Sequence, residues 1–256
     1  MIMTGSDRMA RITLLDVPTD AQTFDTALTT LSEWARDRSG RRYVCTCPVY
    51  TLMMCREQPE VMRAVSTADM VTADGMPIVW LQRRLGQPDA ERVYGPDLMR
   101  ALCQRAPDAR HFFWGGLPGV GERLVERLRI DAPTLQTAGI HAPPIAPVGS
   151  EPDQDAIDRI NGSGADVVWV GLGSPKQDLW MALHRPYLNA PLLIGVGAAF
   201  DLLAGVRRQA PVWMQRTGLE WAFRLIQEPR RLARRYLVYN PRFVWLVLRH
   251  YGLRQR

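Results

Sequence analysis

Charged and polar residues follow short apolar segments that are predicted to be strands. Asp74 and Gly75 come directly after Met70–Thr72, and Arg92 precedes a Gly-Pro turn. The carboxyl ends of parallel strands meet at one edge of a sheet, where ligands bind. There a carboxylate can accept a proton from a substrate hydroxyl, and an arginine can bind phosphate. The alternatives are that Asp74 caps the following helix and that Arg92 pairs with a carboxylate.

Glycine-rich turns follow three other apolar segments, at residues 114–121, 171–178 and 195–201. Glycine lets a ligand approach the backbone, and a helix N-terminus attracts anions. The first two turns match neither GxGxxG nor GxxxxGK[ST], so support for a dinucleotide site or a P-loop is weak. Tight turns without a ligand, and a helix cap at Asp201, are the alternatives. We assign substrate binding to Gly173, Ser174, Lys176, Gly197 and Asp201.

The sequence offers little to hold a metal ion. Asp153-Gln154-Asp155 is formally a DxD triplet, but it opens a predicted helix, where the helix dipole favours acidic residues in any case. The four histidines are isolated, and Cys45, Cys47, Cys55 and Cys103 contain no CxxC pair. We therefore predict no metal, no cofactor and no disulfide, and expect reduced thiols.

Strand-like and helix-like segments alternate as far as Gly205. This alternation predicts an α/β fold with a Rossmann-like, mainly parallel sheet and helices on both of its faces. The polar stretch 140–154 is interpreted as a loop, because the strand pattern continues beyond it. The predicted strands are Arg11–Val17, Tyr43–Thr46, Met70–Thr72, Arg110–Trp114, Leu135–Ala138, Asp166–Gly171 and Leu192–Val196. The predicted helices are Phe24–Arg36, Pro59–Thr67, Pro77–Leu85, Asp97–Arg105 (with Asp97 as its N-cap), Gly119–Arg129, Gln154–Asn161 and Lys176–His184.

The last fifty residues differ in character. From Arg207 to Arg256 there are twelve arginines, interleaved with aromatic residues, and only two acids, Glu220 and Glu228. The helical pattern places aromatic residues beside a stripe of arginines, and Pro229 is expected to begin a new helix. We predict a Rossmann-like core over residues 1–205 and a basic, aromatic, helical appendage over residues 206–256.

The concentration of charge in the tail predicts an anionic partner. A diphosphate, lipid headgroups and nucleic acid all fit the charge, and a solvated helix packed on the domain is the alternative. No window offers the ~20 apolar residues that span a bilayer. Residues 1–16 contain acids and lack the apolar region of a signal peptide. No nucleic-acid motif accompanies the arginines, so lipid is favoured over nucleic acid.

Taken in order, the motifs form a set that covers Ile12 to Tyr239. They are Thr46; Thr72-Ala73-Asp74-Gly75-Met76-Pro77; Arg92 with Gly95-Pro96-Asp97-Leu98; Gly173-Ser174-Pro175-Lys176-Gln177-Asp178; Gly195-Val196-Gly197 with Phe200-Asp201 and Ala204-Gly205; Gly218-Leu219-Glu220-Trp221 with Arg224-Leu225 and Glu228-Pro229; and Arg234-Arg235-Tyr236. Their order and spacing resemble the WecG/TagA/CpsF glycosyltransferases, glycosyltransferase family 26.

The resemblance implies a bacterial enzyme that moves a sugar, such as an N-acetylhexosamine or another hexose derivative, from a UDP-sugar to a sugar on a polyprenyl diphosphate. It implies cell-surface polysaccharide synthesis, inversion at the anomeric carbon and no required metal. It also implies that Asp74 is the general base and that Thr46, Arg92 and Gln177 are the other catalytic residues. The appendage arginines that it places over the donor diphosphate are Arg224, Arg231 and Arg234.

These implications agree with the chemistry of the residues. A carboxylate can take the acceptor proton, and arginines can stabilise the charge on departing UDP. We expect a cytoplasmic protein, peripheral at the inner face of the cell membrane, with no nucleic-acid partner and a possible homo-oligomeric state. The rivals are a non-catalytic basic adaptor for anionic lipid or nucleic acid, and a nicotinamide-dependent oxidoreductase. The missing GxGxxG disfavours the oxidoreductase.

The chain departs from the family pattern at three places. Pro48 stands where relatives often have Asn, and Cys45 and Cys47 flank Thr46. Residues 209–213 read Gln-Ala-Pro-Val-Trp where Arg-Ala-Pro-x-Trp is common, and Gln177 is followed by Asp in place of Glu. The change at Pro48 bears on contacts to the acceptor, and none of the departures removes a proposed catalytic group.

Overall fold

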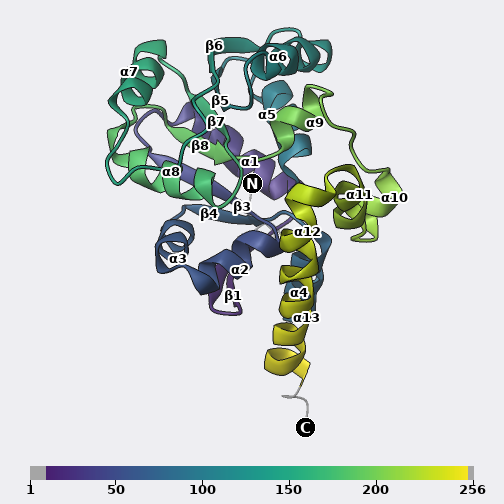
Figure 1. Ribbon diagram of the computed structural model, residues 1–256. Coiled ribbons are helices and arrows are strands. Elements are labelled where there is room, and N and C mark those ends of the chain that lie inside the picture. Colours follow the sequence, from purple (N-terminus) through teal and green to yellow (C-terminus); the bar gives the residue numbers. More distant parts are fainter. Residues whose placement is uncertain (1–9, 253–256) are drawn as a thin grey trace.

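The structure is a computed structural model that describes residues 10–252 and contains an eight-stranded sheet (Figure 1). Residues 1–9 and 253–256 lie outside this description, and so do the parts of our expectations for the N-terminus and the tail that fall on them. The strand order is β1-β2-β4-β3-β8-β7-β5-β6, in which only the β1–β2 pair is antiparallel. The strands are β1 (Ala10–Leu14), β2 (Val17–Ala21), β3 (Arg42–Cys47), β4 (Met70–Ala73), β5 (Arg110–Gly115), β6 (Gln136–His141), β7 (Val167–Gly171) and β8 (Leu192–Gly195).

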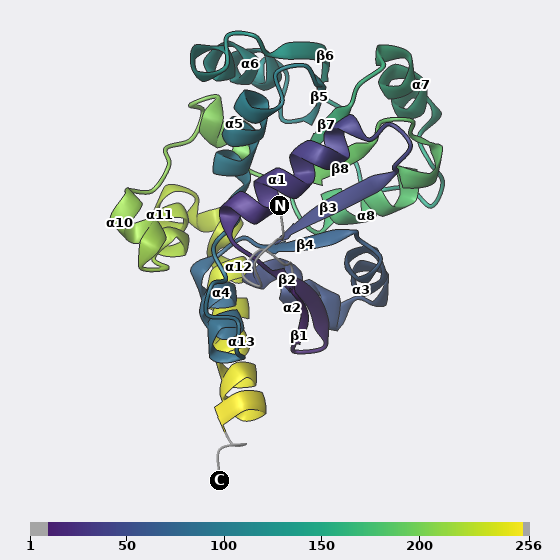
Figure 2. The same ribbon diagram turned by 180° about the vertical axis from the view of Figure 1, so that it is seen from behind.

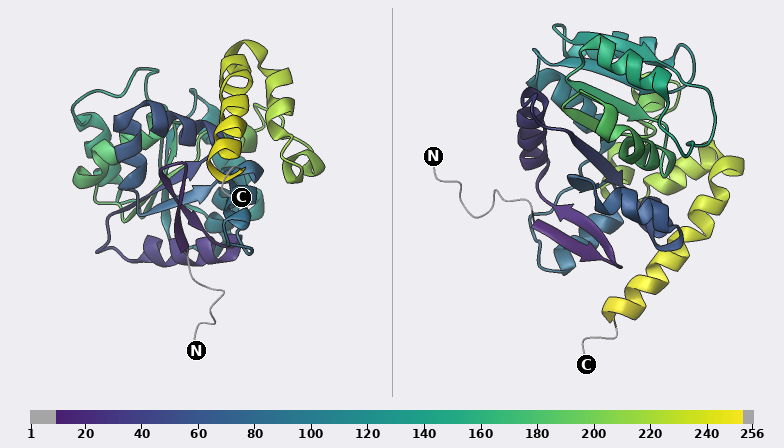
Figure 3. Two further views of the ribbon diagram at one scale, coloured as in Figure 1. Left: turned by 90° about the horizontal axis from the view of Figure 1, so that it is seen from below. Right: turned by 90° about the vertical axis from the view of Figure 1, so that its left-hand side faces the viewer.

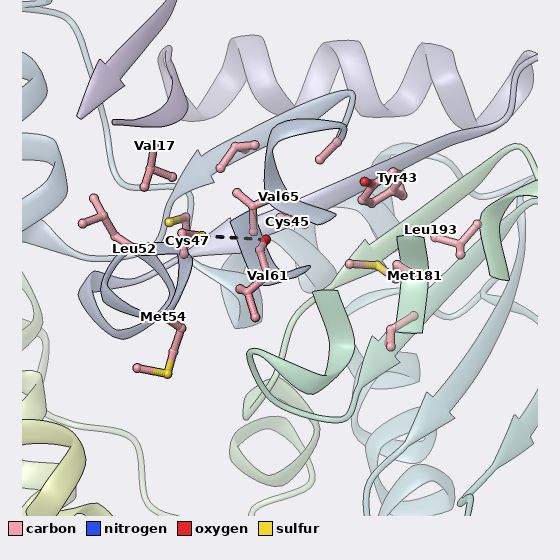
Figure 4. Close-up of a cluster of buried hydrophobic side chains, with 14 of the residues drawn as sticks. Val17, Tyr43, Cys45, Cys47, Leu52, Met54, Val61, Val65, Met181 and Leu193 are labelled. Carbon is pink, nitrogen blue, oxygen red and sulfur yellow. Dashed lines mark hydrogen bonds between the residues drawn. The ribbon is translucent and has the colours of Figure 1, made fainter. Parts of the chain in front are cut away.

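Helices cover both faces of the sheet, and this confirms the predicted fold class (Figures 1 and 2). Side chains alternate between the faces of a strand, so Cys45 of β3 joins one buried cluster and Val44 joins the other. Figure 4 shows the first cluster, in which β3 meets Leu52 and Val61. This cluster holds α2 (Val49–Glu57), α3 (Pro59–Ser66), α4 (Met76–Arg84), α7 (Gln154–Ser163) and α8 (Lys176–His184), which is followed by the short helix η1 (Arg185–Tyr187). The second holds α1 (Phe24–Arg36), α5 (Gly95–Arg105), α6 (Val120–Asp131) and α9 (Ala199–Leu203).

The first strand is shorter than predicted. A single strand over Arg11–Val17 was expected, but β1 ends at Leu14 and a two-residue turn leads into β2. Leu15 and Asp16 both have positive φ, 48° and 72°, as a tight hairpin turn requires. Leucine rarely adopts this conformation, and the sequence therefore gave no turn signal. Tertiary contacts compensate: the Leu15 side chain is buried, and its N–H donates to the Tyr251 hydroxyl at 3.0 Å.

Two helices also differ from expectation. Helix α2 was not predicted, because its five consecutive buried residues, Thr51 to Cys55, leave no amphipathic period to recognise. Helix α5 begins at Gly95 with Tyr94 as its N-cap, so the prediction that Asp97 is the N-cap is wrong. Asp97 lies in the first turn, where its charge still favours the helix.

The basic tail folds into four α-helices and a final helical turn after α9. They are α10 (Val212–Arg216), α11 (Glu220–Gln227), α12 (Pro229–Leu237), α13 (Tyr239–Val247) and η2 (Leu248–Gly252). The predicted helix start at Pro229 is confirmed. In residues 10–252, no helix has both the length and the apolar character needed to cross a bilayer.

Helix α13 packs against α2 and then extends beyond the body of the sheet (Figures 1 and 3). Its residues Tyr239, Phe243 and Leu246 are buried and join the first cluster. Helix α13 therefore contributes to the same core as the sheet. The division of the chain at Gly205 stays a prediction.

Candidate active site

A cavity of about 950 Å³ lies where β3, β4, β7 and β8 end. Helices α11, α12 and α13 of the basic tail line another side of the cavity. This is the edge at which parallel sheets bind ligands. Ten of the twelve predicted site residues line the cavity, whereas Lys176 and Arg234 do not; the ten are Thr46, Asp74, Arg92, Gly173, Ser174, Gln177, Gly197, Asp201, Arg224 and Arg231.

Asp74 has the environment of a general base. It directly follows β4, and α4 begins behind it with Gly75 as the N-cap and no side-chain cap, so the capping alternative for Asp74 is excluded. Its Oδ1 is buried without a hydrogen-bond partner. Burial raises the pKa of Asp74 to about 7, the positive charge of Arg92 opposes this rise, and the negative charge of Glu220 adds to it. A carboxyl group with this pKa can exchange a proton near neutral pH.

Arg92 connects Asp74 to the basic tail. Its Nη2 lies 2.5 Å from Glu220 Oε2 and 3.7 Å from Asp74 Oδ1. The Tyr94 hydroxyl donates to Glu220 Oε1 at 3.1 Å, and the Arg92 guanidinium lies 3.8 Å from the centre of the Tyr94 ring. Arg224 Nη1 approaches the same carboxylate at 3.8 Å. Glu220 therefore holds α11 over this edge of the sheet, and the alternative that Arg92 pairs with carboxylates is confirmed.

Thr46 and Gln177 hold the backbone at the edge of the cavity. The Thr46 hydroxyl donates to the Gly195 carbonyl at 2.7 Å. Gln177 accepts from the Gly197 N–H at 2.8 Å and donates to the Ser174 hydroxyl at 3.2 Å. These bonds fix two glycine-rich turns beside each other. Gly173, in the first of these turns, has a positive φ of 77° and open space where a Cβ would lie. A ligand can therefore approach its backbone.

The other glycine-rich turn, residues 114–121, does not line the cavity. A Cβ on Gly115 would lie 2.6 Å from the Gly171 carbonyl group, so close packing of β5 against β7 explains the glycine. The tight-turn alternative therefore holds for this segment.

The tail arginines that line the cavity differ in their contact partners. Arg207 bridges Asp201 at 3.2 Å and Glu228 at 3.1 Å, and Arg231 pairs with Glu228 at 2.5 Å. Arg235 instead lies over the Tyr50 ring, 4.3 Å from its centre. The helical pattern placed Arg235 on the arginine stripe with Arg224 and Arg231, but the family resemblance pointed to Arg234, which does not line the cavity.

The acidic triplet Asp153-Gln154-Asp155 stabilises the start of α7. Asp153 caps α7 by accepting from the N–H groups of Asp155 and Ala156, and Asp155 pairs with Arg159 at 2.6 Å. Within the described part of the chain, no three His, Cys, Asp or Glu side chains gather as metal ligands would. The four cysteines are free and buried.

A buried base beside an arginine-lined cavity, on a mainly parallel α/β sheet, is an arrangement suited to group transfer from a phosphorylated donor. The sequence model of the glycosyl transferase WecG/TagA/CpsF family matches residues 12–256. A curated relative from Bacillus spizizenii, an N-acetylglucosaminyldiphosphoundecaprenol N-acetyl-beta-D-mannosaminyltransferase, is 31% identical over 197 residues, which are 76% of this chain and 74% of the relative. The chain belongs to the WecG/TagA/CpsF family and is a glycosyltransferase, as the motifs predicted.

Proposed function

We propose that this glycosyltransferase moves a hexose derivative, such as an N-acetylhexosamine, from a UDP-sugar to a sugar on a polyprenyl diphosphate. The transfer serves the assembly of a bacterial cell-surface polysaccharide. One observation carries the proposal: Asp74, with a pKa of about 7, shares its cavity with Arg224 and Arg231. The relative supports it, because its name specifies an acceptor sugar on diphosphoundecaprenol and transfer of N-acetylmannosamine.

In this proposal Asp74 removes the proton from the acceptor hydroxyl, and the hydroxyl oxygen attacks the anomeric carbon. Attack from the face opposite the departing UDP inverts the configuration at that carbon. The carboxylate must be ionised to act, and a pKa near 7 makes a substantial fraction available at neutral pH. Arg92 orients this carboxylate through the ion pair at 3.7 Å.

Departing UDP carries growing negative charge on its diphosphate, and arginine side chains can stabilise that charge without a metal ion. Arg224 and Arg231 reach the cavity from α11 and α12. We assign the nucleotide to the turns at Gly173 and Gly197, where the backbone is accessible. Lys176 and Arg234 do not line the cavity, so the proposal gives them no direct contact with the donor.

The proposal also places the enzyme at the inner surface of the cell membrane. Val244, Trp245 and Leu248 are each more than half exposed near the end of the tail. The Arg249 guanidinium lies 5.2 Å from the centre of the Trp245 ring. Exposed apolar and aromatic side chains beside arginine suit the interface of an anionic lipid layer.

The donor assignment predicts selective stabilisation by uridine nucleotides. A ligand at about 100 times its Kd adds ~2.7 kcal/mol to the free energy of unfolding. For a chain of this size we expect the thermal midpoint to rise by roughly 5–10 °C with UDP or a UDP-sugar in EDTA. NAD and GDP are the matched controls and should leave the midpoint unchanged. A UDP response no larger than the NAD response would favour the adaptor over the transferase.

A further inference from the structure

Arg235 is a partly buried cation without a direct ion-pair partner among the described residues. Its Nε is buried without a hydrogen-bond partner, and no carboxylate within residues 10–252 lies within ion-pair distance of it. By contrast Arg92, Arg224 and Arg231, which line the same cavity, each pair with a glutamate. A charge removed from water without a partner costs folding free energy. An anionic ligand would supply the missing partner.

The surroundings of Arg235 are apolar and aromatic. Its guanidinium lies over the Tyr50 ring, and that ring makes an edge contact with Tyr239, with 5.3 Å between ring centres. Arginine binds phosphate groups through paired N–H donors, and an aromatic face beneath the guanidinium can fix its plane without neutralising its charge.

The cavity continues from Arg235 along α4 and α13. The part formed by α4 includes Met76, Pro77 and Trp80. The end of α12, helix α13 and the start of η2 also line the cavity, and five of their lining residues recur every three or four positions, which places these five on one helix face. They are Leu237, Pro241, Val244, Trp245 and Leu248; Asn240, Phe243 and Val247 also line the cavity.

This lining is partly open to solvent, although it is apolar. The side chains of Trp80, Val244 and Trp245 are 47%, 54% and 54% exposed. Tyr239, Phe243 and Leu246 of α13 pack into the core, and Phe243 also borders the cavity. Core packing therefore explains one face of α13 and leaves the cavity face without an occupant among the described residues.

We propose that Arg235 binds the diphosphate of the lipid-linked acceptor, and that α4 and α13 hold the first isoprene units of its chain. The inference rests on the proposed function and adds a subsite to it. The acceptor has a sugar, a diphosphate and an isoprenoid chain in that order. The cavity offers Asp74, Arg235 and an apolar groove. A nucleotide would match Arg235 but would gain nothing from the apolar lining beyond it.

Binding of isoprenyl diphosphates to the full chain tests the role of Arg235. Arg235→Gln should weaken the binding of farnesyl diphosphate by about 10- to 100-fold, as expected for a lost hydrogen bond to a charged group. The affinity for UDP should change by less than about twofold, because UDP occupies the donor turns. The matched control is Arg230→Gln, which removes an exposed arginine of α12 that does not line the cavity. It should leave both affinities within about twofold.

Three results would contradict the role of Arg235. UDP binding could fall as much as farnesyl diphosphate binding, which would assign Arg235 to the donor. Arg230→Gln could cause the same loss, which would indicate general electrostatic attraction. Arg235→Gln could bind farnesyl diphosphate as tightly as the wild-type protein, which would show that Arg235 does not bind the diphosphate. Arg235→Gln should unfold at or above the wild-type thermal midpoint, because it removes an unpaired charge and breaks no folded-state ion pair.

The isoprenoid groove is tested separately, by the dependence of binding affinity on the length of the isoprenyl chain. Wild-type protein should bind farnesyl diphosphate on the order of tenfold more tightly than geranyl diphosphate, because one more isoprene unit is buried. Trp245→Ala should reduce this ratio to about threefold or less. Equal wild-type affinities for the two lengths would overturn the groove. These assays measure binding alone, so their failure would leave sugar transfer standing. A protein that binds no UDP would instead contradict the proposed function.

Discussion

Asp74→Asn should lower kcat by about 10²- to 10⁴-fold, the usual contribution of a positioned general base. Asparagine keeps the shape of the side chain but cannot accept the proton of the acceptor hydroxyl. The affinity for UDP should stay within about threefold, because the arginines and glycine-rich turns that we assign to the donor are unchanged. Steady-state rates of UDP release and UDP binding by calorimetry measure the two effects separately. Unchanged turnover in the variant would exclude Asp74 as the base.

The pH profile of the wild-type enzyme tests the same assignment. Because the pKa of Asp74 is raised to about 7, kcat/KM should rise with pH below this value and reach a plateau above it. Glu220 contributes to the raised pKa, so Glu220→Gln should move the rising limb to lower pH. The residual activity of Asp74→Asn should lack this limb.

Stability provides the folding control for Asp74→Asn. The pKa of Asp74 is higher in the folded chain, about 7, than its ordinary value of 3.8. The folded state therefore binds the Asp74 proton more tightly than the unfolded state does. The stability that this protonation contributes is fully present below pH 3.8 and is lost as pH rises through about 7. Asparagine has no charge to bury, so the variant should unfold at or above the wild-type midpoint at pH 8. A much lower midpoint would attribute its lost activity to misfolding.

Arg92→Met should have the largest effect on stability. Arg92 and Glu220 side chains are only 14% and 12% exposed, and they meet at 2.5 Å. Breaking a buried ion pair by removing one partner costs roughly 3–5 kcal/mol in the free energy of unfolding. After removal of Arg92, the Glu220 carboxylate keeps only the Tyr94 hydroxyl and the more distant Arg224, at 3.8 Å. We expect about 3 kcal/mol, because both side chains keep some contact with water. Denaturant unfolding at neutral pH measures this change.

A second substitution separates the ion pair from packing. Glu220→Gln in the Arg92→Met background removes the stranded carboxylate and should restore more than half of the lost stability. Arg100→Met is the matched control, because Arg100 pairs with Asp131 at 3.0 Å while both side chains are over 40% exposed. Its cost should stay below about 1 kcal/mol. If Arg92→Met costs no more than this control, Glu220 does not anchor the tail through Arg92.

The position of Asp74 at the edge of the sheet was predictable because it depends on local sequence. Strand length, a following glycine and the alternation of strands with helices place Asp74 at the carboxyl end of β4, and the structure brings it beside Arg92. The parallel sheet follows from the same alternation. Such signals need only a few neighbouring residues. The turn at Leu15 was missed because contacts with residues more than two hundred positions away hold it.

The pairing within the site was not predictable for a similar reason. Glu220 is one of two acids in the tail, yet nothing in its neighbourhood indicates Arg92, which lies 128 residues earlier. The helical pattern placed Arg235 beside Arg224 and Arg231, but the family motif pointed to its neighbour Arg234, which is exposed and does not line the cavity. The available signal for Glu220 was that it is one of only two acids among the twelve arginines of the tail. For Arg235, the sequence offered only its place on the arginine stripe.

Acceptor-dependent release of UDP tests the central claim most directly. The purified protein would be mixed in EDTA with UDP-N-acetylhexosamines and a lipid-linked N-acetylglucosaminyl diphosphate, and the lipid product would be weighed by mass spectrometry. We predict that one UDP-sugar gives UDP and a lipid heavier by one sugar residue, and that omission of the acceptor abolishes both. UDP release without any change in the lipid, or transfer that requires an added metal ion, would contradict the account.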